Sequence, residues 1–227
     1  MQFMRKSVLK YLTVILGFYI LSLGVVLFVK SSLGTTPISC INYVLSLHTP
    51  LTLGSATFLF NVVLILIELM LIRGIGTKRD RIEILLQVPF SALLGLFMDI
   101  NMRLLGPIEV DSYPMAVGFV LAGCITQALG VVLELKPNVA IMSAEGVVKY
   151  SSRRWNRDFG RMKVAFDITL VTMAAMLSFA LAGHIEGLRE GTVVAAVCTG
   201  FIVSAMIRYI FTPARVHRAT SALCGSH

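Results

Sequence analysis

Charged side chains are scarce in this sequence. Only 14% of its 227 residues are Asp, Glu, Lys or Arg, whereas 56% are hydrophobic and the mean hydropathy is +0.83. Such a composition is outside the range of soluble globular proteins and predicts an integral membrane protein. The net charge of +8 would suggest nucleic acid binding in a soluble chain. Because the basic residues fall between hydrophobic stretches, we expect the lipid bilayer as the partner and no nucleic acid.

The motifs of common catalytic and metal sites are also missing. The four cysteines are scattered without a Cys-x-x-Cys pair, and three of them lie within apolar runs. They are therefore interpreted as small buried hydrophobes, not as a disulfide framework. No His-Glu-x-x-His, P-loop or Gly-x-Ser-x-Gly motif occurs. We expect no enzyme activity, no metal site and no cofactor.

Six hydrophobic stretches are each long enough to cross a hydrocarbon core of about 30 Å. They are residues 11–29, 53–72, 84–105, 114–133, 162–183 and 192–211. With the N-terminus in the cytoplasm, 17 of the 20 basic residues lie inside or at the inner boundary, and the exceptions are Lys30, Arg103 and Arg189. The positive-inside rule and the even number of spans therefore predict that both termini are cytoplasmic.

The chain repeats itself when it is shifted by 106 positions. The sequence Leu-Gly-Val-Val-Leu of residues 23–27 recurs at 129–133, and in both copies a lysine follows three positions later. Each unit contains three spans, and an odd number of spans inverts the second unit relative to the first. We therefore predict an all-α integral membrane fold of two inverted three-helix repeats. The expected boundaries within one membrane domain, 1–227, are 8–105 for repeat 1, 113–212 for repeat 2 and 213–227 for a cytoplasmic tail.

Each unit also contains an apolar segment that is too short to cross the membrane. In the first, Gly34 to Leu47, Thr36 is a suitable N-cap that would accept a hydrogen bond from a free backbone N–H, and Pro37 suits the first helical position. A helix from there to Leu47 would extend roughly 16 Å, about half a span. Its counterpart is expected at 138–151. Non-helical backbone at that depth needs burial or water, so two re-entrant half-spans predict a midplane cavity.

Two acidic residues are the leading candidates for coupling to protons or cations. Asp167 aligns with Asn61 in the repeat and lies inside an apolar span, where an ionisable group is costly and by default functional. An ordinary ion pair with Lys163 at i−4 has comparable support. Glu145 aligns with Ser39 in the repeat. It faces the cavity if its helix is re-entrant, and it faces solvent if its helix lies at the membrane surface. The apolar neighbours of Glu145 favour the cavity.

The expected solute site combines these residues with the polar residues around the starts of the two half-spans. Helix N-termini there favour an anionic or carbonyl group, although capping and helix contact are the alternative roles. The predicted site residues are Thr35, Thr36, Pro37, Ser39, Asn42, Asn61, Asn138, Ser143, Glu145 and Asp167. The remaining acids within or beside the spans are expected to be structural, with Asp99 paired to Arg103, Glu68 at the inner interface and Glu134 beside Lys136.

Three short segments of the chain carry recognisable motifs: Leu33 to Ser39, Leu53-Gly54 with Phe60-Asn61, and Arg189 to Thr192. These segments resemble the YczE/YitT-like family of bacterial integral membrane proteins. The resemblance covers about residues 8–212. It implies a multi-pass protein of the bacterial inner (plasma) membrane, in a largely uncharacterised family with presumed transport activity, and it implies nothing about the substrate.

These observations together predict a membrane transport protein. It would move a small polar or charged molecule or ion through a midplane site between the repeats, with proton or cation coupling. The alternatives are a non-autonomous binding or assembly subunit that works with a partner complex, and an uncoupled channel. Exposed small-residue faces are compatible with a homodimer, although nothing in the sequence selects one.

Overall fold

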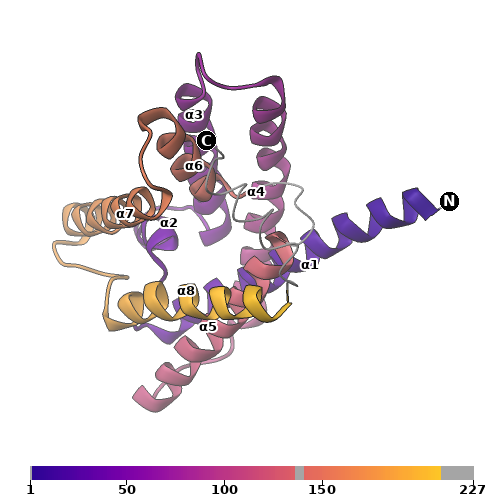
Figure 1. Ribbon diagram of the computed structural model, residues 1–227. Helices are drawn as coiled ribbons and strands as arrows, with labels where there is room; N and C mark the ends of the chain where they lie inside the picture. The colour runs from indigo at the N-terminus through magenta and orange to yellow at the C-terminus, as the bar shows by residue number, and fades with distance from the viewer. Residues whose placement is uncertain (1, 136–140, 211–227) are drawn as a thin grey trace.

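The structure is a computed structural model that describes residues 2–135 and 141–210, and all regular secondary structure in these two ranges is α-helical. This confirms the predicted all-α class. The described part of the chain forms eight helices in this order (Figure 1): α1 Gln2–Ser31, α2 Pro37–His48, α3 Leu53–Leu71, α4 Lys78–Leu104, α5 Tyr113–Leu135, α6 Ser143–Trp155, α7 Phe159–Ala182 and α8 Glu190–Ile210.

Five of the described helices are long and apolar enough to cross a membrane: α1, through Leu9–Ser31, and α3, α4, α5 and α7. Each coincides with an expected span, and the set is typical of a multi-pass membrane protein. The sixth expected span corresponds to α8, whose clearly described apolar part, Glu190–Val203, is shorter than a span. The sixth crossing therefore stays a prediction.

Polar side chains fix where several of these helices begin. Thr52 accepts a hydrogen bond from Ser55 N at 3.1 Å at the start of α3, and Thr77 accepts one from Asp80 N at 3.2 Å at the start of α4. Asp158 caps α7 in the same way. Each cap satisfies a backbone N–H that has no partner inside its own helix. Because the caps precede the apolar runs, α4 and α7 begin several residues before the expected spans.

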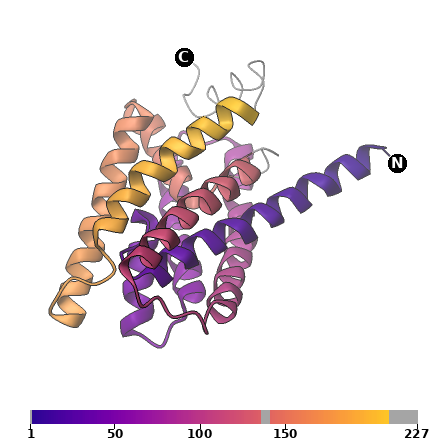
Figure 2. The same ribbon diagram turned by 90° about the horizontal axis from the view of Figure 1, so that it is seen from below.

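Helices α1 and α5 cross at the centre of the molecule, and Figure 2 shows them passing close to each other. Glycines make this crossing possible. A methyl group on Gly24 would lie 2.6 Å from Gln127 N of α5, and one on Gly130 would lie 2.5 Å from Leu21 N of α1. These two glycines are 106 positions apart in the chain. The crossing therefore uses equivalent positions of the repeated sequence.

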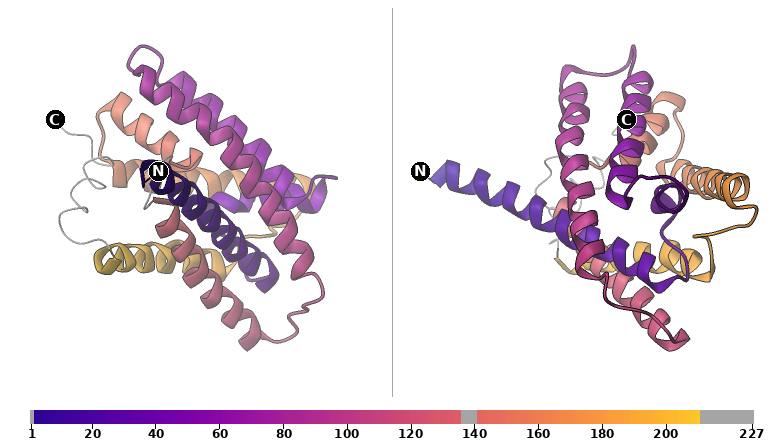
Figure 3. Two further views of the ribbon diagram at one scale, coloured as in Figure 1. Left: turned by 90° about the vertical axis from the view of Figure 1, so that its right-hand side faces the viewer. Right: turned by 180° about the vertical axis from the view of Figure 1, so that it is seen from behind.

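The other helices pack around this crossing in related pairs. The repeat relates α1, α2, α3 and α4 to α5, α6, α7 and α8, in that order. The contact of α1 with α4 therefore corresponds to that of α5 with α8. In the same way, the contacts of α2 with α7 and with α3 correspond to those of α6 with α3 and with α7. One pair breaks the pattern. Helices α3 and α4 run side by side, as both views of Figure 3 show, whereas α7 and α8 have no comparably extensive contact.

The two short helices begin at equivalent points of the repeat. Helix α2 begins at Pro37, as predicted, and α6 begins at Ser143, which is 106 positions later. The prediction placed the start of the second half-span at residue 138, five positions too early. Asn138 itself lies outside the described residues. No side-chain cap precedes α6, since its N-cap residue is Met142, so the sequence carried no local signal for the true start.

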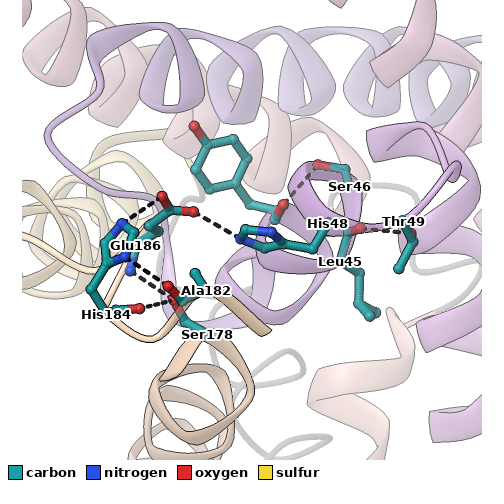
Figure 4. A network of polar contacts seen from close by, with 9 residues as sticks. Leu45, Ser46, His48, Thr49, Ser178, Ala182, His184 and Glu186 are labelled. Atoms are coloured by element: carbon teal, nitrogen blue, oxygen red, sulfur yellow. Dashed lines mark hydrogen bonds and ion pairs between the residues drawn. The ribbon is translucent and has the colours of Figure 1, made fainter. Parts of the chain in front are cut away.

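The C-terminal end of each short helix is tied to a loop of the other half of the chain. His48 Nε2, at the end of α2, lies 2.8 Å from Glu186 Oε2 in the α7–α8 loop, and Figure 4 shows this contact. Arg153, near the end of α6, lies 3.2 Å from Asp80 and also donates to Ile75 O in the α3–α4 loop. The two helices are thus held by reciprocal links between the halves.

Candidate functional site

A cavity of about 110 Å³ lies among helices α1 to α6. Its walls come from the N-terminal parts of both short helices, from the first half of α3 and from the C-terminal halves of α1, α4 and α5. The residues around it are Leu21, Val25, Thr36, Ile38, Ser39, Asn42, Thr57, Asn61, Leu94, Met98, Gln127, Val131, Glu134, Leu135, Ile141, Met142, Ala144 and Glu145. The polar side chains gather on α2, α3, α5 and α6, whereas α1 and α4 contribute apolar ones.

Helix α2 presents three polar side chains to the cavity, Thr36, Ser39 and Asn42. The spacing of three residues places them along one face of the helix. Thr36 is the N-cap residue, as predicted, but its hydroxyl makes no capping bond and donates instead to Ser39 Oγ at 3.1 Å. Asn42 is only 1% exposed, and its Oδ1 has no hydrogen-bond partner in the described part of the chain. This wall therefore has an unused acceptor.

The wall formed by α3 and α6 brings two predicted residues into direct contact. Ser143 Oγ donates to Asn61 Oδ1 at 2.7 Å, and both side chains are buried. Asn61 lines the cavity, and no described residue accepts a hydrogen bond from its Nδ2. Glu145 also lines the cavity from the first turn of α6. No described residue bonds to the Glu145 carboxylate.

Helix α5 contributes two polar residues that the sequence analysis did not assign to the site. Gln127 and Glu134 line the cavity together with Val131. Glu134 is 4% exposed and has no hydrogen-bond or ion-pair partner among the described residues, and Lys136, its expected neighbour, lies outside them. The spacing of 127, 131 and 134 places all three on one helical face. That spacing is the sequence signal that could have placed Glu134 in the site.

The remaining predicted residues lie beside the cavity or away from it. Thr35 is buried just before α2 and donates to Cys40 Sγ at 3.3 Å, and Pro37 is buried in the first turn of α2. Asp167 does not line the cavity. Its carboxylate lies 2.7 Å from Lys163 Nζ on the same helix, which is the ion pair that the sequence left open.

Two other acids have surroundings that differ from the sequence expectation. Glu68 is fully buried, accepts a hydrogen bond from Gln87 Nε2 at 3.0 Å, and lies against α6, where a methyl group on Gly146 would be 2.5 Å from Glu68 Oε2. Asp99 accepts hydrogen bonds from Thr52 Oγ1 at 2.7 Å and from the backbone N of residue 54 at 2.8 Å. Asp99 thus joins α4 to the start of α3, and its expected ion pair with Arg103 does not form.

The buried turn between α1 and α2 holds the cavity wall in place. Residues 33–36 are buried, and Gly34 has a φ of +116°, a conformation that glycine adopts without strain. Thr35 N donates to Gly187 O at 3.2 Å, and Gly191 N donates to Leu33 O at 2.8 Å. The α7–α8 region therefore satisfies backbone groups of a segment that has no helical partner, as buried non-helical backbone requires.

Comparison with known proteins places most of this chain in one family. Residues 8–208 match a family of unknown function (DUF6198). The chain belongs to this family. Its description does not name YczE/YitT-like proteins, so that resemblance stays an expectation. No curated protein and no solved structure matches the chain.

Proposed function

We propose that this DUF6198 member is a membrane transport protein that moves a small polar or charged solute through the cavity among α1 to α6. The proposal includes six membrane spans, with α8 as the sixth, in two inverted repeats that each contain one re-entrant half-helix. The observation that carries it is that the N-terminal parts of both short helices meet at one cavity, which is lined by apolar residues and several polar side chains. Discontinuous helices at the interface of inverted repeats are a recurrent way to build a transport site.

The cavity lining supports a position between the two repeats. Ten of its residues form five pairs that are 106 positions apart in the chain: Leu21 and Gln127, Val25 and Val131, Thr36 and Met142, Ile38 and Ala144, and Ser39 and Glu145. Residues related by an inverted repeat come together only near the axis that relates the repeats. Two of these pairs combine a polar residue with an apolar one, and the pair of Ser39 and Glu145 combines a hydroxyl with a carboxylate, so the two sides of the site have different chemistry.

The links at the ends of α2 and α6 agree with opposite insertion of the half-helices. Helix α6 ends beside the α3–α4 loop and the first turn of α4, which together contain Arg73, Lys78, Arg79 and Arg81. Helix α2 ends beside the α7–α8 loop, in which Arg189 is the one Lys or Arg. The positive-inside rule puts these two loops on opposite sides of the membrane. The half-helices would then enter from opposite faces, and their N-terminal parts would meet at the cavity.

The cavity size limits the solute to a small molecule or ion. An apolar cavity of about 150 Å³ holds one benzene molecule, and the cavity here is about 110 Å³ and partly polar. A solute of a few heavy atoms would fit without rearrangement of the helices.

Flux measurements with a blocked cavity test this function. A thermal-shift screen of the purified protein first identifies a ligand, since a ligand at 100 times its Kd adds about 2.7 kcal/mol of stability. Uptake of that ligand into proteoliposomes is then compared for the wild type, Ser39→Phe and Thr172→Phe. Ser39 lines the cavity, whereas Thr172 is exposed on α7.

We expect saturable uptake that is lost in Ser39→Phe and retained in Thr172→Phe. Equal uptake by both variants would show that the solute does not pass through the cavity. Ligand binding without uptake by the wild type would instead favour a binding subunit that needs a partner complex, and uptake without saturation would favour a channel.

A further inference from the structure

We infer that the ligand of this cavity is positively charged, either a monovalent inorganic cation or a small organic amine, and that the carboxylates of Glu134 and Glu145 bind its charge. The inference rests on the proposed function and adds the chemical class of the solute. It differs from the expectation that the half-helix N-termini would select an anionic or carbonyl group.

The surroundings of Glu134 require something to neutralise it. Its side chain is 4% exposed, and none of the described residues offers it a hydrogen bond or an opposite charge. An ionised carboxylate without a partner costs several kcal/mol even after the surrounding protein has relaxed. Either a proton or a bound cation removes that cost. Glu145 lines the same cavity.

Neutral acceptors complete the surroundings that a cation needs. Asn42 Oδ1 and Gln127 Oε1 belong to residues that line the cavity, and neither atom has a partner among the described residues. Asn42 is 1% exposed, so water at the protein surface does not satisfy its oxygen. An ammonium group would donate hydrogen bonds to such oxygens, and a metal ion or the water molecules of its hydration shell would bind them as well. Within the described lining there is no Lys, Arg or His to repel it.

The helix N-termini do not outweigh these acids. The positive end of a helix dipole corresponds to about half an elementary charge. Helix α6 already carries Glu145 in its first turn, so its N-terminal charge is offset within the helix itself. Two carboxylates therefore exceed the combined effect of the two helix ends, and the cavity as a whole favours a cation.

The number of ligands argues for a monovalent ion or an amine. Sites that bind a divalent metal tightly usually combine three or more acidic, His or Cys side chains. No such group exists in the described part of the chain. Two carboxylates with amide oxygens, in a cavity of about 110 Å³, fit a small cation that forms hydrogen bonds or keeps part of its hydration shell.

Thermal shifts with simple salts test this inference on the purified full chain. The probes are the chlorides of sodium, potassium, ammonium, methylammonium and guanidinium. N-methylglucamine chloride serves as the reference at equal ionic strength, and acetamide, urea and N-methylglucamine acetate are the uncharged and anionic probes. Wild type is compared with Glu134→Gln, and Asp167→Asn is the matched control because it removes an acid from a span away from the cavity.

At least one of the five cations should raise the Tm of the wild type and of Asp167→Asn. The apparent affinity of the protein for that cation should be at least tenfold lower in Glu134→Gln than in the wild type. If Glu134→Gln does not fold, Glu145→Gln should show the same loss. The inference is overturned if none of the five cations shifts the Tm, or if the shift persists in the Glu134→Gln and Glu145→Gln variants. A shift by acetamide, urea or acetate alone, sensitive to Ser39→Phe, would overturn the cation but leave the proposed transport site standing.

Discussion

Three acidic side chains within the helices have three different environments. Asp167 pairs with Lys163, Glu68 accepts a hydrogen bond from Gln87, and Glu134 faces the cavity without a described partner. The same functional group therefore serves helix stability, packing and, in our proposal, binding. Substitution of each residue should affect a different measurable property.

Glu68 should contribute to stability through its hydrogen bond with Gln87. Glu68→Ala leaves the buried Gln87 amide without its acceptor, which costs about 1–3 kcal/mol in addition to the lost packing. Glu68→Gln keeps a carbonyl oxygen at that position and should lose much less. Unfolding of the purified protein in mixed detergent micelles measures both variants. Equal loss in the two would show that the hydrogen bond is not the cause.

Glu186 should make the link between α2 and the α7–α8 loop sensitive to acid. Its hydrogen bonds, first with His48 and then with His184, hold the pKa of this exposed carboxyl below its ordinary value of 4.5. A lowered pKa means that the ionised form stabilises the fold above that ordinary value and that the stabilisation disappears as pH falls through the lowered pKa. The Tm advantage of the wild type over Glu186→Gln should thus be present at pH 6 and shrink below about pH 4.5. An advantage that is independent of pH would contradict this role.

Part of the site could be predicted from individual residues, and part could not. Thr36, Ser39 and Asn42 follow from the three-residue spacing at the start of a recognisable half-span. Glu134 and Asp167 look alike in sequence, as single acids in or at the end of apolar runs. The packing of α5 between α1 and α8 sets the rotation that turns Glu134 toward the cavity, and pattern alone does not give that rotation.

At the level of whole elements, the close crossing of α1 and α5 positions the cavity wall. Gly24 and Gly130 let the two backbones approach, and Leu21 of α1 and Gln127 of α5 both line the cavity. Small residues at helix crossings in membranes allow this packing. A larger residue at the crossing should therefore affect both stability and the cavity.

Gly130→Ala should destabilise the protein, because its methyl group would lie 2.5 Å from Leu21 N. Overpacking of this kind typically costs about 1–3 kcal/mol. Gly118→Ala is the matched control on α5, since a methyl group there meets nothing within 4 Å and alanine favours the helix. Thermal unfolding of both variants in the same detergent measures the difference. A Tm loss in Gly118→Ala as large as in Gly130→Ala would contradict the crossing as its cause.

The helix boundaries show which elements the sequence could locate. The start of α2 was predicted because Thr36 and Pro37 give a local signal, and the long apolar helices were predicted from their length. The start of α6 was misplaced because Asn138, a good capping residue, preceded the true start at Ser143. The repeat offset of 106 applied to Pro37 gives residue 143 directly. The long-range pattern was thus the better guide here.

For the whole molecule, the distribution of basic residues predicts the orientation in the membrane. Six spans with 17 of 20 basic residues on the inner side or at its boundary would place both termini in the cytoplasm. The side of the membrane on which each terminus lies is measured by fusing two reporters to it in turn, one that fluoresces in the cytoplasm and one that is active only in the periplasm. Activity of the periplasmic reporter at the C-terminus alone would mean that α8 does not cross, and the six-span proposal would fail.

In the proposed function, the cavity between α2 and α6 is a passage across the membrane. A cysteine placed at the cavity wall tests this passage without knowledge of the solute. Ser39→Cys in a chain whose native cysteines are replaced is treated with a small, membrane-impermeant thiol reagent, in right-side-out and in inside-out vesicles. Thr172→Cys on the exposed face of α7 is the control. We predict labelling of Ser39→Cys from both sides and none of Thr172→Cys. Labelling from one side only, or from neither, would contradict the account.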